Sequence, residues 1–159
     1  MISAFIALGA NLGDPARTLH SALRELDRIP DTRVLRHSRL YRSRAVGPPQ
    51  PDYVNAVAQV ETALSPHELL DALFGIEASH GRVRDGQRWG PRTLDLDLLI
   101  YADLQLCDAR LTLPHPELAR RNFVLAPLVE IAPDVLIPGQ GPARQALQWV
   151  GSEGLALCQ

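Results

Sequence analysis

The stretch YVNAVAQVETALSPHELL, residues 53–70, changes its hydrophobic period in the middle and so predicts two neighbouring elements of the fold. Up to residue 64 the chain alternates, which predicts a β-strand with one apolar and one mixed face. The apolar face holds Val54, Ala56, Ala58 and Val60, and the other holds Tyr53, Asn55, Val57, Gln59 and Glu61. Ser65, Pro66 and Glu68 then match an N-cap, a first helical residue and a capping box. A helix is therefore expected to follow, ending near Gly81.

On either side of this strand and helix, hydrophobic patterns predict further elements. Residues 2–8 form a short apolar run typical of a buried strand, and a helix is expected from Asp14 and Pro15 to about Arg28. The remaining expected elements are a strand over residues 33–42, a proline-rich loop over 43–52, a strand carrying Asp95 and Asp97, a hairpin over 101–113, two short helices within 115–133 and one more near 142–150.

The order of these elements is β-α-β-β-α-β with helical additions at the C-terminus. This order predicts an α+β fold of the ferredoxin-like class, with an antiparallel sheet and both helices on one face. The second face is then expected to be free for a site. A length of 159 residues predicts a single domain, residues 1–159.

Charge and composition exclude several classes of function. All 16 basic residues are arginine, so no lysine can serve in a G-x-x-x-x-G-K-[ST] phosphate loop, a protein-kinase strand or a Schiff base. A net charge of −2 gives little support for nucleic-acid binding. Cys107 and Cys158 have no paired spacing, and we see neither a signal peptide nor an apolar run of membrane-spanning length. We expect a cytoplasmic protein that binds neither nucleic acid nor a membrane.

Asp95 and Asp97 lie two residues apart in a predicted strand, so both carboxylates belong to one face. Two like charges at that spacing repel one another unless a cation lies beside them. Mg²⁺ is bound through one or two carboxylates and completes its shell with phosphate oxygens and water. The alternative is a solvated strand face with two incidental acids.

Arginine and glycine are concentrated just before this strand, in GRVRDGQRWGPR, residues 81–92. Arginine side chains are forked, permanently charged donors suited to a polyphosphate, and the glycines would let the loop close over a ligand. By itself the segment fits a solvated surface loop better; beside the acid pair we interpret it as part of a site. A second basic group lies downstream and consists of Arg110, His115, Arg120 and Arg121, near Thr112.

Three aromatic residues could hold a flat heterocycle, namely Tyr53, Trp89 and Phe123. Asn55 shares the predicted strand face of Tyr53, so its amide could read the edge of a stacked ring. Ordinary core packing is the alternative for each aromatic side chain.

These segments together resemble the 6-hydroxymethyl-7,8-dihydropterin pyrophosphokinase family of folate biosynthesis. The resemblance rests on RWGPRTLDLDLL, residues 88–99, and extends through IALGANLGDP, GPPQPDYVNAV, GRVR and LTLPHPELARRNFVLAPLVEIAP. It implies an enzyme that transfers the β,γ-diphosphoryl group of ATP to the pterin hydroxymethyl group and releases AMP. It also implies two Mg²⁺ ions, with ATP as co-substrate.

The resemblance also implies roles for particular residues. Asp95 and Asp97 would bind both metals and, with Arg82 and Arg92, would be the catalytic residues. The residues implied for ATP are Leu70, Glu77, Arg82, Arg84, Trp89, Arg92, Leu98, Arg110, Thr112, His115 and Arg121. The residues implied for the pterin are Ser43, Arg44, Val46, Tyr53, Asn55, Trp89 and Phe123. The chain departs from the family pattern at Arg44, Phe74, Asp85 and Pro116.

Two other functional classes could be built on a ferredoxin-like sheet, and the first of them also uses paired acids. A palm-type nucleotidyl transferase would release pyrophosphate and would bind a nucleic acid or a second nucleotide. A non-catalytic ligand-sensing domain would leave the acids and the clustered arginines without a purpose. The pyrophosphokinase, acting as a monomer on two small substrates, is the function that we expect.

Overall fold

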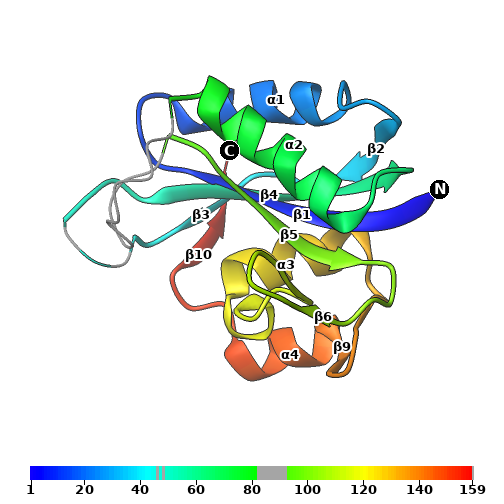
Figure 1. The fold of residues 1–159 in the computed structure, drawn as a ribbon. Helices are drawn as coiled ribbons and strands as arrows, with labels where there is room; N and C mark the ends of the chain where they lie inside the picture. The colour runs from blue at the N-terminus through cyan, green and yellow to red at the C-terminus, as the bar shows by residue number, and fades with distance from the viewer. Residues whose placement is uncertain (46, 48, 82–92, 159) are drawn as a thin grey trace.

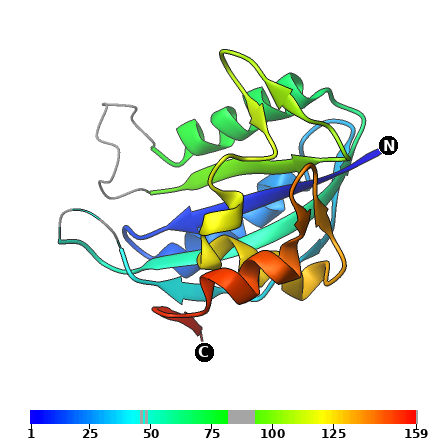
Figure 2. The ribbon, with the colours of Figure 1, turned by 90° about the horizontal axis from the view of Figure 1, so that it is seen from below.

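The structure is a computed structural model that describes residues 1–45, 47, 49–81 and 93–158. Figure 1 shows one central sheet with helices on both sides, and Figure 2 shows the same molecule from below. The strands are β1 (Ile2–Ala10), β2 (Thr32–His37), β3 (Tyr41–Ser43), β4 (Tyr53–Thr62), β5 (Asp95–Tyr101), β6 (Leu106–Cys107), β7 (Thr112–Leu113), β8 (Leu136–Ile137), β9 (Gly141–Pro142) and β10 (Leu155–Leu157). The helices are α1 (Pro15–Leu26), α2 (Pro66–Ser79), the 3₁₀ turn η1 (Leu118–Arg120), α3 (Asn122–Ile131) and α4 (Ala143–Val150).

The central sheet is antiparallel and has the strand order β10-β3-β4-β1-β5, with β2 also paired to β4. β1 therefore lies between β4 and β5. Its register opposes Gly9 to Asn55 on one side and to Asp95 on the other, and opposes Ala7 to Asp97. The β-α-β-β-α-β core and the ferredoxin-like class are confirmed. The register places Asp95 of the predicted acid pair and the predicted amide of Asn55 on opposite sides of β1, both level with Gly9.

α1 and α2 cover one face of the sheet, as predicted (Figure 1). The alternating residues Val54, Ala56, Ala58 and Val60 all belong to the buried cluster beneath these helices. Both helix starts follow the sequence signals. Asp14 accepts a hydrogen bond from the backbone N–H of Arg17 at 3.2 Å, and Ser65 and Glu68 form the full capping box. The capping residues therefore fix the residue at which each helix begins.

The second face is not free, contrary to the expectation for this sheet. α3 packs across β4, and α4 packs on α3 (Figure 2). Phe5, Val57 and Leu99 on the strands are buried with Leu125 and Leu128 of α3 in a second apolar cluster. The C-terminal helices thus bury this face, except toward the end of β1 where Gly9, Asn55 and the two aspartates lie.

The strand predicted over residues 33–42 is in fact two strands, β2 and β3, separated at residues 38–40. Ser38 is buried, and its hydroxyl accepts the backbone N–H of Val57 at 3.0 Å and donates to the carbonyl of Arg39 at 2.7 Å. The Ser38 side chain thus replaces a backbone acceptor of the ladder, and regular pairing is interrupted there. The hairpin β8–β9 and the edge strand β10 were not predicted, because they are only two or three residues long.

The predicted hairpin over residues 101–113 is confirmed as the pair β6–β7, and the short helices within 115–133 as η1 and α3. α4 matches the helix expected near residues 142–150. Within the described part of the chain, no helix has the length and apolar character needed to cross a membrane.

Candidate active site

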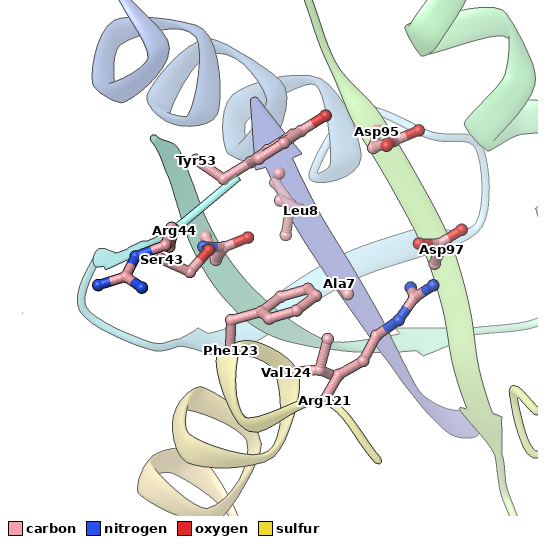
Figure 3. Close-up of a pocket in the computed structure, with 12 residues that line it drawn as sticks. Ala7, Leu8, Ser43, Arg44, Tyr53, Asp95, Asp97, Arg121, Phe123 and Val124 are labelled. Carbon is pink, nitrogen blue, oxygen red and sulfur yellow. The ribbon is translucent and has the colours of Figure 1, made fainter. Parts of the chain in front are cut away.

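A cavity of about 310 Å³ opens at the end of β1, between Tyr53 and Phe123. Figure 3 shows the two aromatic rings on opposite sides of this space, with the aspartates of β5 along a third side. Tyr53 comes from the first residue of β4 and Phe123 from the first turn of α3. Among the described residues, the lining consists of Ala7, Leu8, Gly9, Ser43, Arg44, Tyr53, Asn55, Asp95, Asp97, Arg121, Phe123 and Val124. The space between the rings suits a flat heterocycle.

The floor of this cavity carries one polar group, the side-chain amide of Asn55, and one position without a side chain, Gly9. The side-chain amide of Asn55 is buried and donates to the hydroxyl of Ser43 at 2.8 Å, which fixes its orientation. Gly9 lies opposite Asn55 in the ladder. A Cβ atom at Gly9 would lie 3.4 Å from Asn55 Oδ1 and 3.8 Å from Tyr53 Cδ1. The missing side chain therefore leaves room for a ligand directly beside the amide.

A second cavity, of about 320 Å³, lies between α2, β5 and the segment that includes β7. One wall is the apolar stripe of α2 and the opposite wall runs from Asp108 to Thr112. The residues of the described ranges that line it are Leu70, Phe74, Glu77, Asp95, Leu96, Asp97, Leu98, Asp108, Ala109, Arg110, Leu111, Thr112, His115 and Pro116. Glu77 is 3% exposed and accepts the backbone N–H of Leu96 at 2.8 Å, which ties α2 to β5 at the base of this cavity.

Asp95 and Asp97 are the residues that line both cavities. The strand alternates as predicted, because both carboxylates are half-buried while Leu94, Leu96 and Leu98 are fully buried on the α2 side. Their oxygens are hard donors of the kind that Mg²⁺ prefers. Among the described residues no three His, Cys, Asp or Glu side chains come together as a metal cage. The residues present therefore fit an ion that takes the rest of its shell from substrate phosphates and water.

His115 and Arg121 flank Asp97. The distance between His115 Nε2 and Asp97 Oδ1 is 3.8 Å. Burial is the main cause that lowers the pKa of His115; the charge of Asp97 opposes this shift and that of Arg121 adds to it. Nδ1 of the neutral ring accepts the backbone N–H of Glu117 at 3.1 Å, so its proton resides on Nε2, toward Asp97. His115 thus offers a donor to an anionic ligand.

Arg121, predicted as an ATP residue, lines the first cavity and not the second. Its guanidinium carbon lies 5.8 Å from the centre of the Phe123 ring, and Figure 3 shows the guanidinium directed toward Asp97. A cation over the face of an aromatic ring is favourable. Arg121 can therefore balance negative charge near Asp97 while it supports the ring wall of the first cavity.

The structure brings most of the predicted site residues to these two cavities. Ser43, Arg44, Tyr53, Asn55 and Phe123 line the first, and Leu70, Glu77, Leu98, Arg110, Thr112 and His115 line the second, as both linings show. Arg44 contributes to the first cavity, but its guanidinium points away from the aspartates (Figure 3). Arg120 does not line either cavity and forms an ion pair with Glu117 at 3.3 Å.

Some predicted residues cannot be placed. Val46, Arg82, Arg84, Trp89 and Arg92 lie outside the described residues, so their assignments stay predictions. Other lining residues were missed, among them Gly9 and Asp108. Gly9 interrupts an apolar run next to the predicted turn, and that signal could have marked a close approach of a ligand. Asp108 carries no comparable sequence signal.

Comparison with known proteins gives a consistent family relationship. Residues 5–133 match the family described as 7,8-dihydro-6-hydroxymethylpterin-pyrophosphokinase (HPPK). A Haemophilus influenzae protein named 2-amino-4-hydroxy-6-hydroxymethyldihydropteridine pyrophosphokinase is 50% identical over 139 residues, covering 87% of this chain and 86% of that protein. A Methylorubrum extorquens protein of the same name is 43% identical over 156 residues and covers 98% of both chains.

A solved structure shares the fold at much lower sequence identity. The crystal structure of wild-type Plasmodium falciparum HPPK-DHPS with pteroate matches with a TM-score of 0.70 at 13% identity. The match covers 93% of this chain and 42% of the Plasmodium chain, so this chain spans about two fifths of that protein. At this identity the likeness supports the fold alone.

Proposed function

Because the chain belongs to the 7,8-dihydro-6-hydroxymethylpterin-pyrophosphokinase family, we propose that its two cavities are the pterin and ATP sites of that enzyme. The chain is an enzyme of folate biosynthesis that transfers the diphosphoryl group of ATP to the hydroxymethyl group of 6-hydroxymethyl-7,8-dihydropterin. The observation that carries the assignment of the sites is that the cavities meet at Asp95 and Asp97. A donor in one cavity and an acceptor in the other would face each other there.

The first cavity would hold the pterin. Tyr53 and Phe123 would stack on its two faces, and Asn55, oriented by Ser43, would read its polar edge. The ring would lie over Gly9, where no side chain blocks the floor. A ring seated in this way can direct its hydroxymethyl group toward the aspartates.

The second cavity would hold ATP. The apolar side chains Leu70, Phe74 and Leu98 suit the base, while Arg110, Thr112 and His115 offer donors to the ribose and phosphates. Arg121 would contact the phosphates near Asp97. Arg82 and Arg84 are proposed to line the phosphates, and Trp89 and Arg92 to close over the nucleotide, as the resemblance implies.

Asp95 and Asp97 would hold two Mg²⁺ ions together with the phosphate oxygens of ATP. When bound, Mg²⁺ supplies neutralising charge at the transferred phosphoryl group. The carboxylates would keep the ions at the boundary of the two cavities. His115 Nε2–H would add a neutral donor, and the Arg121 guanidinium would add fixed positive charge and further donors, around the same phosphates, in a geometry that exists before the reaction.

The reaction proposed for this geometry is an in-line displacement at the β-phosphorus. The hydroxymethyl oxygen forms a bond to the β-phosphorus and releases its proton, and the bond from that phosphorus to the oxygen bridging the α-phosphorus breaks. AMP leaves with the bonding electron pair. Because phosphoryl transfer needs little covalent help, the chain contributes mainly alignment and charge. We further propose that residues 1–159 act as one domain and as a cytoplasmic monomer.

A product assay tests the proposed function against its alternatives. Protein, ATP, Mg²⁺ and the hydroxymethylpterin are mixed and the phosphorus-containing products are identified by ³¹P NMR. Equal amounts of AMP and pterin diphosphate are expected. Pyrophosphate would support the nucleotidyl transferase, and the absence of turnover in an enzyme that still binds both ligands would support the sensing domain.

A further inference from the structure

Two ion pairs connect α2 to the segment before β7, across the second cavity. His67 Nε2 lies 2.7 Å from Asp108 Oδ2, and the Nη2 group of Arg110 pairs with Asp71 Oδ1. His67 and Asp71 are four residues apart and so lie on one side of α2, next to the stripe of Leu70 and Phe74 that lines the cavity. These pairs tie one wall of the cavity to the other.

Asp108 fixes the backbone from which Arg110 projects. Its Oδ1 accepts the backbone N–H groups of Arg110 and Leu111, both at 2.9 Å. These two hydrogen bonds are the main causes that hold the pKa of Asp108 below its usual value. The segment is therefore a preformed turn, and its backbone does not depend on Asp71.

Asp71 instead fixes the side chain of Arg110. Arg110 lines the cavity, whereas Asp71 does not, and both side chains are at least half exposed. An exposed arginine without such a partner samples many rotamers, and a ligand that uses it must offset that lost freedom. A guanidinium has five N–H donors. The pair with Asp71 is made through Nη2, so donors on Nε and Nη1 remain for a phosphate or ribose oxygen.

We propose that Asp71 is a positioning residue that holds Arg110 in place to receive the nucleotide, and that it does not itself contact the nucleotide. The proposal rests on the assignment of the second cavity to ATP. Asp71 acts before binding, by reducing the rotamers that Arg110 loses when ATP enters. Its effect is on nucleotide affinity, while the rate of the transfer step is set at Asp95 and Asp97.

A double-mutant cycle tests this proposal. The Kd for the Mg²⁺ complex of α,β-methylene-ATP, which cannot release AMP, is measured by calorimetry for the wild type, Asp71→Asn, Arg110→Gln and the double variant. Asp71→Asn is expected to raise Kd about two- to five-fold, the range for an exposed ion pair. kcat with ATP should stay within about two-fold. In the Arg110→Gln background, Asp71→Asn should leave Kd unchanged.

Two controls separate positioning from a general structural effect. Asp71→Glu keeps the carboxylate and should restore most of the affinity. Asp134→Asn removes the exposed ion pair with Arg144, which lies outside both cavities, and should change neither Kd nor kcat.

Three results would overturn the proposal. An equal loss of affinity on Asp71→Asn in both backgrounds would show that Asp71 does not act through Arg110. A lower Kd would show that Asp71 competes with the nucleotide for Arg110. An unchanged Kd in Arg110→Gln would remove Arg110 from the nucleotide site. Failure of the proposed function itself would be seen separately, as a wild-type enzyme that forms no AMP.

Discussion

Replacement of Gly9 by alanine should damage the pterin site while leaving the fold and the nucleotide site intact. The added Cβ would lie 3.4 Å from Asn55 Oδ1 and 3.8 Å from Tyr53 Cδ1, which are ordinary contact distances, so the sheet can accept it. A methyl group takes up about 25–30 Å³, close to the share of one water molecule. That is roughly a tenth of the cavity of about 310 Å³, and it would stand on the floor where the ring must lie.

The expected magnitude follows from the hydrogen bond that the ring is proposed to make with Asn55. A ring lifted off the floor would lose this bond and leave one polar atom of the buried amide unsatisfied, at a cost of about 1–3 kcal/mol. Since each 1.4 kcal/mol is a factor of ten, the Kd for the pterin should rise roughly five- to 150-fold. The Kd for ATP should stay within about two-fold.

Gly75→Ala is the matched control. Gly75 is exposed on α2, and a Cβ there would meet nothing within 4 Å. This change should leave both affinities unaltered and should stabilise the helix by up to about 1 kcal/mol. Both affinities can be measured by fluorescence or calorimetric titration, with thermal melts to confirm folding. An unchanged Kd for the pterin in Gly9→Ala, or an equal rise in the Kd for ATP, would refute the assignment of Gly9 to the floor of the pterin site.

Three further predictions concern catalysis, a helix cap and a buried phenol. Asp97→Asn should lower kcat roughly 10²- to 10³-fold, the range for loss of one preorganised electrostatic group, with an unchanged melting temperature; near-normal turnover would disprove its role. Ser65→Ala removes the N-cap bond to Glu68 N at 3.2 Å and should cost about 1 kcal/mol in urea unfolding, whereas Ser65→Asp should cost little. Burial, aided by Glu130, raises the pKa of Tyr41 from 10.0 to about 12, so its stabilising contribution is present below pH 10 and is lost as the pH rises to about 12. An absorbance titration should show a late phenolate transition that is missing in Tyr41→Phe; its persistence there would contradict the assignment.

The elements of the core could be predicted because their local signals agree with the tertiary structure. Alternation in β4 and the capping box at Ser65 specify a strand and a helix that the sheet and its apolar cluster then reinforce. The fold class also followed, because a β-α-β-β-α-β chain has few ways to form an antiparallel sheet. The acid pair could be placed on one face from the strand period alone.

Where prediction failed, the deciding interactions are non-local. The break between β2 and β3 depends on the Ser38 hydroxyl bonding to Val57, which is 19 residues away in the chain. The burial of the second sheet face depends on α3 docking against Phe5 and Val57. Neither contact leaves a periodic pattern in the sequence, so a free face and an unbroken strand were the natural expectations.

The same distinction between local sequence signals and non-local contacts applies to the site. Strand parity placed Tyr53 with Asn55, and Asp95 with Asp97. Phe123 was joined to Tyr53 only by the family resemblance, since their pairing requires α3 to reach the end of β1. The link from Asp71 to Arg110 joins residues 39 positions apart and has no motif at all. Such pairs are found only when the folded chain brings them together.

A crystal structure with Mn²⁺ in place of Mg²⁺, α,β-methylene-ATP and the hydroxymethylpterin tests the assignment of the two cavities most directly. Two anomalous metal peaks are expected between the phosphates and the carboxylates of Asp95 and Asp97, with the pterin between Tyr53 and Phe123 and the nucleotide against α2 and residues 108–112. Metal peaks away from Asp95 and Asp97, or a nucleotide bound outside the second cavity, would contradict it.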